Sequence, residues 1–414
     1  MKNQFVNWES QTNDIFLNPS LDLKTQNSYK SLIENSIQQT GLKGHIWLAT
    51  SGTTNQGNGG LGKCVALSKQ SFLNSAVAVG QHLDVTKKDI WGLVLPQYHV
   101  GGLSIKARCF VSGQKCEIYT QKWSASLFSN FLSEYKITLT SLVPTQVYDL
   151  IAQKIKSPAP LRAVVVGGAS LSESLYIEAR KLGWPLLPSY GMTETASQVA
   201  TASLSSLESV IYPQLRVLNH AQLRIVEENQ IESTNTNKSN RNELNDELIQ
   251  IKCSSLLTGY AYQNEFIDPK IKGWFKTEDR GELSVDPKLK NVFYIKLLGR
   301  SSDYIKIKGE GVSKPALENM LNEILVKDFP QWVGKCYLQS VFDERSGNKM
   351  ILIAELSSVG GEGIDGVFKA KEFESLELQK IKNKFNERVL NHEQIQEISP
   401  IDSALQNPSF KRIL

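Results

Sequence analysis

The residues with the clearest chemical potential lie between Ser189 and Gln198, in the stretch S-Y-G-M-T-E-T-A-S-Q. This stretch combines the carboxylate of Glu194 with hydroxyls, an amide and a glycine. Such a set can ligate a hard cation and hydrogen-bond phosphate or carboxylate oxygens. The apolar segment 184–187, closed by Pro188, predicts a strand that runs into a loop, which is where chemistry usually lies in α/β domains. Taken alone, the pattern is more typical of a solvated turn.

A second candidate is the loop after the predicted strand 45–49, which reads T-S-G-T-T-N-Q-G-N-G-G-L-G-K over residues 50–63. Glycines let backbone N–H groups converge on an anion, hydroxyls donate hydrogen bonds and lysine adds charge, so the loop suits phosphate. A flexible glycine-rich surface loop stays open as the alternative. Residues 57–63 also spell G-x-x-x-x-G-K, but Cys64 replaces the hydroxyl residue of a P-loop, and 65–67 look like a strand rather than a helix. We therefore disfavour a P-loop.

One further strand end and the helical stretch after it carry candidate functional residues. His99 follows the predicted strand 90–95, beside Gly101 and Gly102, and the functional and structural interpretations are evenly balanced. Lys106 and Arg108 lie in an apolar, helical stretch, where the residues themselves favour snorkelling to the surface over binding an anion.

Asp279 lies in a predicted turn after the aromatic pair 274–275. The plain interpretation is an Asp-capped surface turn. The functional interpretation is a fixed carboxylate that accepts hydrogen bonds from two sugar hydroxyls.

The elements that position these residues alternate between strand and helix from residue 45 to 200, which predicts a largely parallel sheet with flanking helices. The segments 222–226 and 247–251 read as antiparallel strands around a polar insertion, 227–246. The predicted fold class is α/β. Residues 1–298 form a large N-terminal domain with mostly parallel sheets, flanking helices and a smaller β-subdomain, and 299–414 form a small, mobile α+β C-terminal domain.

Composition and net charge argue against nucleic-acid-binding, membrane-spanning and zinc-binding classes of protein. The chain has 414 residues, 41% of them hydrophobic, and a net charge of +4, which is too small to argue for nucleic acid. The sequence contains no apolar run long enough to span a membrane and no signal-peptide core, and its five scattered cysteines do not suggest a zinc site. We expect a cytoplasmic protein with reduced thiols.

In their order, these motifs resemble the adenylate-forming, acyl-CoA synthetase-like family of AMP-binding enzymes, from about residue 45 to the end. The motifs are T-S-G-T-T, L-P-x-x-H-x-x-G, G-G-A-x-L, Y-G-M-T-E-T, T-x-D-x-G, G-R-S-S-D-x-I-K-x-x-G-E and a terminal lysine. Each motif is weak alone, but seven in the right order are specific. The S-Q ending, G-R-S-S-D and G-E-G-V are most like family members that ligate an aryl dicarboxylic acid to coenzyme A.

The resemblance implies an ATP-dependent acid–CoA ligase that uses Mg²⁺, a carboxylic acid, ATP and CoA, and passes through an acyl-adenylate. It implies catalytic roles for Lys411, Thr193, Glu194 and His99, with Glu194 as the metal ligand. It implies nucleotide binding by Thr50, Ser51, Gly52, Thr53, Thr54, Lys63, Gly168, Ala169, Tyr190, Gly191, Asp279 and Arg300. It implies acid binding by His99, Arg108, Ser197 and Gln198, and a domain hinge at Ser302.

The sequence departs from the family pattern in a short segment before Thr50, in Glu278 before Asp279 and in Phe410 before Lys411. A ligase for another aryl or short-chain acid, a domain that loads a carrier protein and a non-catalytic nucleotide- or acyl-binding relative therefore stay open. So do the docking residues for CoA and the oligomeric state, including a homodimer.

Overall fold

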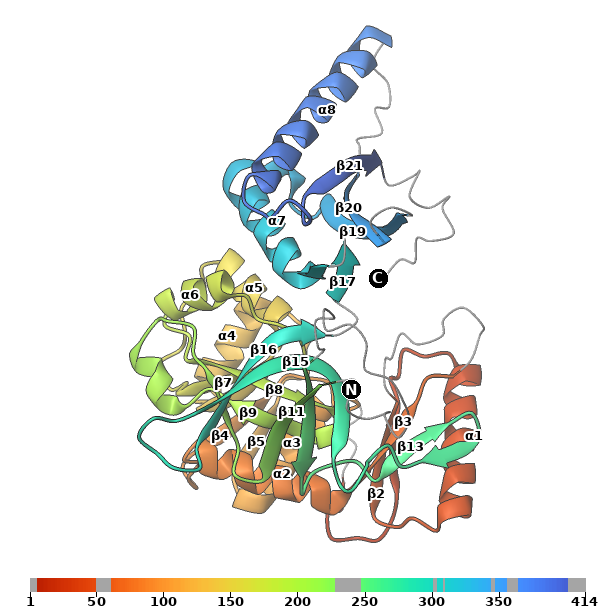
Figure 1. Cartoon of the computed structure of the whole chain (residues 1–414). Coiled ribbons are helices and arrows are strands. Elements are labelled where there is room, and N and C mark those ends of the chain that lie inside the picture. Colours follow the sequence, from red (N-terminus) through yellow and green to blue (C-terminus); the bar gives the residue numbers. More distant parts are fainter. Residues whose placement is uncertain are drawn as a thin grey trace. The chain divides into compact units, whose positions relative to one another are not determined.

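The computed structural model describes residues 6–49, 61–227, 247–300, 304–307, 310–343, 347–355 and 364–400 (Figure 1). The chain divides into two compact units. The first comprises residues 1–226, 249–277 and 281–296, and the second comprises 227–248, 278–280 and 297–414. We describe each unit by itself.

An eleven-stranded sheet dominates the first unit, in the order β11-β12-β15-β16-β10-β9-β8-β7-β6-β4-β5. Its parallel part is β4 (Ile90–Leu93), β5 (Lys115–Ile118), β6 (Leu139–Leu142), β7 (Ala163–Val166) and β8 (Leu186–Met192). The next strands are all antiparallel: β8 pairs with β9 (Ser197–Thr201), β9 with β10 (Leu215–Val217), and β10 with β16 (Phe293–Arg300). The remaining strands are β11 (Ala221–Glu227), β12 (Glu247–Cys253) and β15 (Phe275–Val285). The predicted parallel sheet is confirmed up to β8, after which helical crossovers give way to short connections.

A second sheet has the order β1-β2-β3-β13-β14. Its strands are β1 (Asp14–Phe16), β2 (His45–Ala49), β3 (Cys64–Ser68), β13 (Gly259–Tyr262) and β14 (Glu265–Ile267). Helix α1 (Leu23–Thr40) covers one face. It begins at Leu23 because the Asp22 carboxylate accepts a hydrogen bond from the Thr25 N–H at 2.9 Å, and it ends at Gly41 with φ of 68°.

Helices α2 (Lys69–His82) and α3 (Val100–Ser112) pack between the two sheets, as Figure 1 shows. Helices α4 (Ala125–Glu134), α5 (Pro144–Ala152) and α6 (Glu173–Lys181) cover the opposite face of the large sheet. The alternation along β7 fits these layers, because Val165 faces the α2–α3 core whereas Val164 and Val166 face the α4–α6 core. Both faces of the parallel strands are therefore buried.

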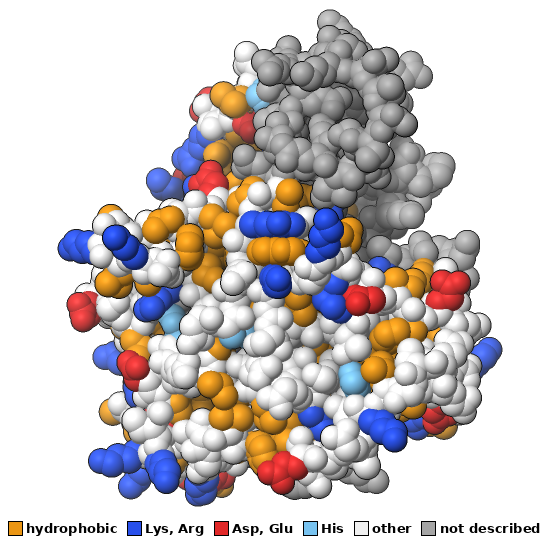
Figure 2. All heavy atoms as spheres, turned by 60° about the horizontal axis from the view of Figure 1, so that its bottom comes forward, with side chains coloured by type: hydrophobic (Ala, Val, Ile, Leu, Met, Phe, Trp, Pro, Cys, Tyr) orange, Lys and Arg blue, Asp and Glu red, His pale blue; other side chains and the backbone are white. Residues whose placement is uncertain are grey.

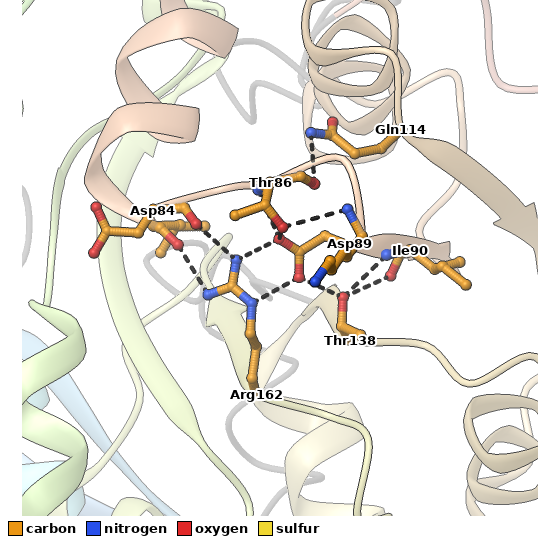
Figure 3. Close-up of polar contacts among 9 residues, drawn as sticks. Asp84, Thr86, Asp89, Ile90, Gln114, Thr138 and Arg162 are labelled. Atoms are coloured by element: carbon orange, nitrogen blue, oxygen red, sulfur yellow. Dashed lines mark hydrogen bonds and ion pairs between the residues drawn. The ribbon is translucent and has the colours of Figure 1, made fainter.

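A polar network ties the amino ends of the parallel strands together (Figure 3). Asp89 precedes β4, Thr138 precedes β6 and Arg162 precedes β7. The Arg162 guanidinium donates to both Asp89 oxygens, at 2.7 and 2.8 Å, and the Thr138 hydroxyl donates to Asp89 Oδ1 at 2.8 Å. The Arg162 side chain also donates to the Leu83 carbonyl at 2.9 Å. The network stabilises the amino edge of the sheet. The candidate site residues follow the strands at the opposite, carboxyl edge.

The second unit contains both helices and strands. Its elements are β17 (Tyr304–Ile307), β18 (Glu310–Ser313), α7 (Lys314–Asp328), β19 (Cys336–Asp343), β20 (Gly347–Ala354), α8 (Ile364–Asn386) and β21 (Ile395–Pro400). The sheet β19-β20-β21 packs against both helices through residues such as Leu338, Leu352 and Ile381.

One face of the molecule shows how charge is distributed. In Figure 2, basic and acidic side chains are spread around the outline with hydrophobic ones between them, rather than forming one block of a single sign. Within the part of the chain that the structure describes, no helix has both the length and the apolar character needed to cross a bilayer.

Candidate active site

The carboxyl edge of the parallel sheet brings several predicted residues to one side of the first unit. Glu194 follows β8, Gly168 follows β7 and His99 follows β4. In the sheet these strands are neighbours in the order β8-β7-β6-β4, so their carboxyl ends lie along one edge. Crevices outside the carboxyl ends of strands are where α/β proteins bind ligands.

The Y-G-M-T-E-T motif is not the loop that the sequence predicted. Strand β8 continues through Pro188 to Met192, a 3₁₀ turn (η1) spans Thr193–Thr195, and β9 returns antiparallel. The sequence had suggested that the strand ends at Pro188. It continues to Met192 because the residues after Pro188 pair with β9. Gly191 is required there, since a Cβ would lie closer than 3.0 Å to backbone atoms of β9.

Thr195 stabilises this turn from inside. Its side chain is fully buried, and its hydroxyl donates to the Ser197 carbonyl at 2.6 Å and accepts from the Met192 N–H at 3.1 Å. Ala196 adopts the left-handed conformation, with φ of 57°. The turn therefore presents Thr193 and Glu194, both half-buried, from a fixed backbone.

Glu194 contacts two parts of the chain that are distant in sequence. Its Oε1 accepts a hydrogen bond from the Tyr260 hydroxyl at 2.8 Å, and its carbonyl accepts from the Leu257 N–H at 2.7 Å. Lys63 Nζ lies over the Tyr260 ring, 5.1 Å from its centroid, and 5.8 Å from that of Tyr262. Sequence reasoning missed both tyrosines. The signal was T-G-Y-A-Y, which alternates two aromatic residues on one face of a strand.

Arg108 is buried, so the snorkelling interpretation favoured from its residue type is wrong. Only 3% of the residue is exposed, and burial lowers the pKa of its guanidinium to about 10. Its Nη2 donates to Ser197 Oγ at 2.9 Å and to Gln198 Oε1 at 2.8 Å, and its Cζ lies 5.1 Å from the Trp91 ring centroid. Its Nε and Nη1 have no hydrogen-bond partner among the described residues. The structure thus groups three of the four residues predicted to bind the acid, namely Arg108, Ser197 and Gln198.

His99 is the N-cap residue of α3, but its side chain makes no capping hydrogen bond. The exposed ring packs on Tyr98 with centroids 4.6 Å apart. Partial desolvation lowers its pKa below the usual 6.5, which favours the neutral imidazole at pH 7. The following Gly102 lets α3 start close to the β4 strand end, because a Cβ there would lie closer than 3.0 Å to the Pro96 and Leu95 carbonyls.

The predicted nucleotide-binding residues on and after β7 and β8 differ in exposure. Gly168 and Ala169 are exposed beyond β7, and Gly168 has φ of 85°, which suits only glycine well. Tyr190, by contrast, is 6% exposed and packs in the core of the large sheet.

Asp279 and Arg300 belong to the second unit. Asp279 lies within the long strand β15, not in the turn that the sequence predicted, because the segment pairs within the sheet. The Arg300 Nε is 3.3 Å from Asp279 Oδ1, and the arginine side chain is 64% exposed. These two residues predicted to bind the nucleotide are therefore neighbours.

The rest of the predicted site lies outside the described residues: Thr50, Ser51, Gly52, Thr53, Thr54, Ser302 and Lys411. After Lys63 the chain enters strand β3, as predicted, and not the helix that a P-loop requires. Among the residues that the structure describes, no three His, Cys, Asp or Glu side chains form a ready-made metal site.

The α/β fold, with polar residues at the carboxyl edge of its parallel sheet, is typical of ligand-binding α/β proteins. A family model also matches part of the chain. Residues 46–239 match the model of the AMP-binding enzyme family. The match covers just under half of the chain, and within this region it confirms the resemblance to AMP-binding enzymes seen in the motifs.

Individual relatives are similar at modest identity. A 2-succinylbenzoate–CoA ligase from Staphylococcus aureus (strain MRSA252) is 29% identical over 285 residues, which cover 68% of this chain and 51% of the relative. The chain thus spans about half the length of the curated relatives it matches.

Two solved structures of o-succinylbenzoate CoA synthetase from Bacillus subtilis share the fold. The complex with the acyl-adenylate intermediate has a TM-score of 0.65 at 23% identity and covers 86% of this chain and 65% of that chain. The complex with ATP and magnesium ion has a TM-score of 0.63 at 23% identity and covers 86% and 66%. At this identity the likeness establishes the fold.

Proposed function

We propose that this chain is an ATP-dependent acid–CoA ligase that acts through an acyl-adenylate. The expected reaction joins o-succinylbenzoate, ATP and CoA to give o-succinylbenzoyl-CoA, AMP and pyrophosphate, a step of menaquinone biosynthesis. In the first half-reaction the carboxylate oxygen attacks the α-phosphorus and pyrophosphate leaves. In the second, the CoA thiol attacks the acyl carbon, AMP leaves and the thiol proton is released.

The proposal that the substrate is o-succinylbenzoate rests on the Arg108 guanidinium. o-Succinylbenzoate has two carboxylates, of which only one reacts, and the other needs hydrogen-bond donors. A buried cation is costly unless its donors are satisfied, and Arg108 keeps two donor nitrogens without a partner among the described residues. A ligand carboxylate would satisfy them. Ser197 and Gln198 hold the guanidinium in place for this purpose.

The nucleotide is assigned to the carboxyl edge beside η1. Glu194 fits a magnesium ligand, because its half-buried carboxylate forms no ion pair among the described residues and holds one oxygen in the Tyr260 hydrogen bond. Bound Mg²⁺ would supply charge neutralisation at the phosphates. A protein of the same fold has been solved with ATP and magnesium ion bound, which supports ATP and Mg²⁺ as the molecules bound here. Thr193 beside Glu194 is expected to contact the α-phosphate, and Lys63 the β- and γ-phosphates.

The remaining roles come from the resemblance. Gly168, Ala169 and Tyr190 are assigned to adenine, Gly191 to the nucleotide in general, and Asp279 with Arg300 to the ribose. Lys411 is assigned to the bridge between the reacting carboxylate and the α-phosphate, from a C-terminal domain that begins at residue 299. His99 is assigned to the entrance of the acid pocket.

The test is release of AMP and pyrophosphate from ATP and CoA, with o-succinylbenzoate, benzoate, a fatty acid or no acid. Release of AMP only with o-succinylbenzoate would support both reaction and substrate. Release with another acid would keep the ligase and discard o-succinylbenzoate. ATP binding without AMP release from any acid would favour a non-catalytic relative, and ADP as product would favour a phosphohydrolase.

A further inference from the structure

Tyr260 lies between two parts of the proposed nucleotide site that the sequence separates widely. Strand β13 pairs antiparallel with β3, with Tyr260 opposite Val65 and Ala261 opposite Cys64. Lys63 directly precedes Cys64, so the two-residue alternation of strands places it on the same face as the tyrosines. The register therefore brings the last residue of the glycine-rich loop beside Tyr260.

The two ends of the Tyr260 side chain make different contacts. The ring face carries the Lys63 ammonium 5.1 Å from its centroid, within the range of a cation–π interaction. The hydroxyl donates to Glu194 Oε1 at 2.8 Å, an ordinary length for an O–H···O hydrogen bond. One rigid ring thus holds a cation on its face and a carboxylate at its edge.

The backbone around Tyr260 is also fixed. The Leu257 N–H donates to the Glu194 carbonyl at 2.7 Å, which joins the segment before β13 to the η1 turn a second time. Gly259 permits the β13–β14 hairpin, because a Cβ there would lie closer than 3.0 Å to the Phe266 ring and the Ile267 carbonyl. The tyrosine therefore stands on a strand with little freedom to shift, as a positioning group requires.

We propose that Tyr260 is a positioning residue that fixes the Glu194 carboxylate and the Lys63 ammonium around one ring, so that both act on the same magnesium-bound triphosphate. This role rests on the proposed function. The hydroxyl pins Oε1 and leaves Oε2 to the metal, and the ring keeps Lys63 aimed at the phosphates. Neither comparison with relatives nor the sequence motifs assign this residue a role.

The test separates the hydroxyl from the ring. Tyr260→Phe removes only the hydroxyl, and Tyr260→Leu removes the ring as well. ATP affinity of the full chain is measured by titration calorimetry with Mg²⁺ and with EDTA. Tyr260→Phe is expected to weaken ATP binding about tenfold with Mg²⁺, the loss of one hydrogen bond to a charged group, and to leave binding in EDTA unchanged. Tyr260→Leu is expected to weaken both.

Tyr135→Phe is the matched control, since Tyr135 is an exposed tyrosine at the end of α4 and should leave both affinities unchanged. Equal weakening by Tyr260→Phe in Mg²⁺ and in EDTA would show a merely structural tyrosine, and unchanged binding would remove the role altogether. Should Tyr260→Leu fail to fold, the Tyr260→Phe comparison still decides. Wild-type protein that binds no ATP would refute the proposed function itself, which is a different outcome from a wild type that binds and a variant that matches it.

Discussion

Arg108→Met removes the buried guanidinium while keeping a long, flexible apolar side chain of similar reach. If Arg108 binds the second carboxylate of the acid, the variant loses charge-assisted hydrogen bonds in a desolvated place. Such a loss is worth about 3 kcal/mol, or roughly a hundredfold in affinity. KM for o-succinylbenzoate should therefore rise about a hundredfold, whereas KM for ATP should stay unchanged.

The same substitution should change stability very little in the absence of substrate. Removing the cation leaves Ser197 Oγ and Gln198 Oε1 without the Nη2 donor, at about 1 kcal/mol each, although the two side chains already hydrogen-bond each other at 3.4 Å. Against this, the variant no longer buries a charge whose Nε and Nη1 have no partner among the described residues, which recovers a similar amount. The two effects offset to within about 1 kcal/mol.

Steady-state kinetics and urea unfolding therefore give a paired measurement. ATP serves as the control substrate, because Arg108 is assigned to the acid and the KM for ATP should be insensitive to Arg108→Met. A variant that loses about 3 kcal/mol or more of unfolding free energy and keeps its KM for o-succinylbenzoate would refute the reasoning, since Arg108 would then be a structural ion held by Ser197 and Gln198 alone.

The remaining predictions concern the half-reactions, pH and the backbone. Lys411→Ala should abolish acyl-adenylate formation yet leave thioester formation from preformed acyl-AMP largely intact, and equal loss of both, measured by single turnover, would contradict its role. Although burial alone would raise it, the hydrogen bonds from Arg162 and its neighbours lower the pKa of Asp89 from 3.8 to about 2. Asp89 thus contributes about 2 kcal/mol of stability above pH 4, lost as the pH falls through 2, and urea melts of Asp89→Asn should lack this acid-dependent loss. Gly191→Ala should cost about 3 kcal/mol because its Cβ meets the backbone of β9, whereas Gly80→Ala, in the last turn of α2 with its nearest atom at 3.7 Å, should stabilise the protein. Thermal melting of both glycine variants checks the contrast, and equal effects would undo it.

Local patterns predicted much of the fold because they depend on neighbours in sequence. The sequence predicted strands at 45–49 and 90–95, close to the observed β2 and β4, and the strand-and-helix alternation predicted the parallel part of the sheet. The short strands β9, β10, β13 and β14 were missed, since each is held by pairing with a distant segment rather than by its own apolar period. The turn predicted at Asp279 failed for the same reason.

The sequence by itself determined the family, through motifs whose order survives at modest identity, and it located Glu194, His99 and Gly168 at strand ends. The boundary at residue 299 and the roles of Lys411 and the 50–54 loop stay predictions. Only the tertiary structure decided that Arg108 is buried against residues 89 and 90 positions away, and that Tyr260 reaches Glu194 across 66 positions. Burial and hydrogen bonding between such distant residues depend on how whole layers pack, and no local pattern of residue types encodes that packing.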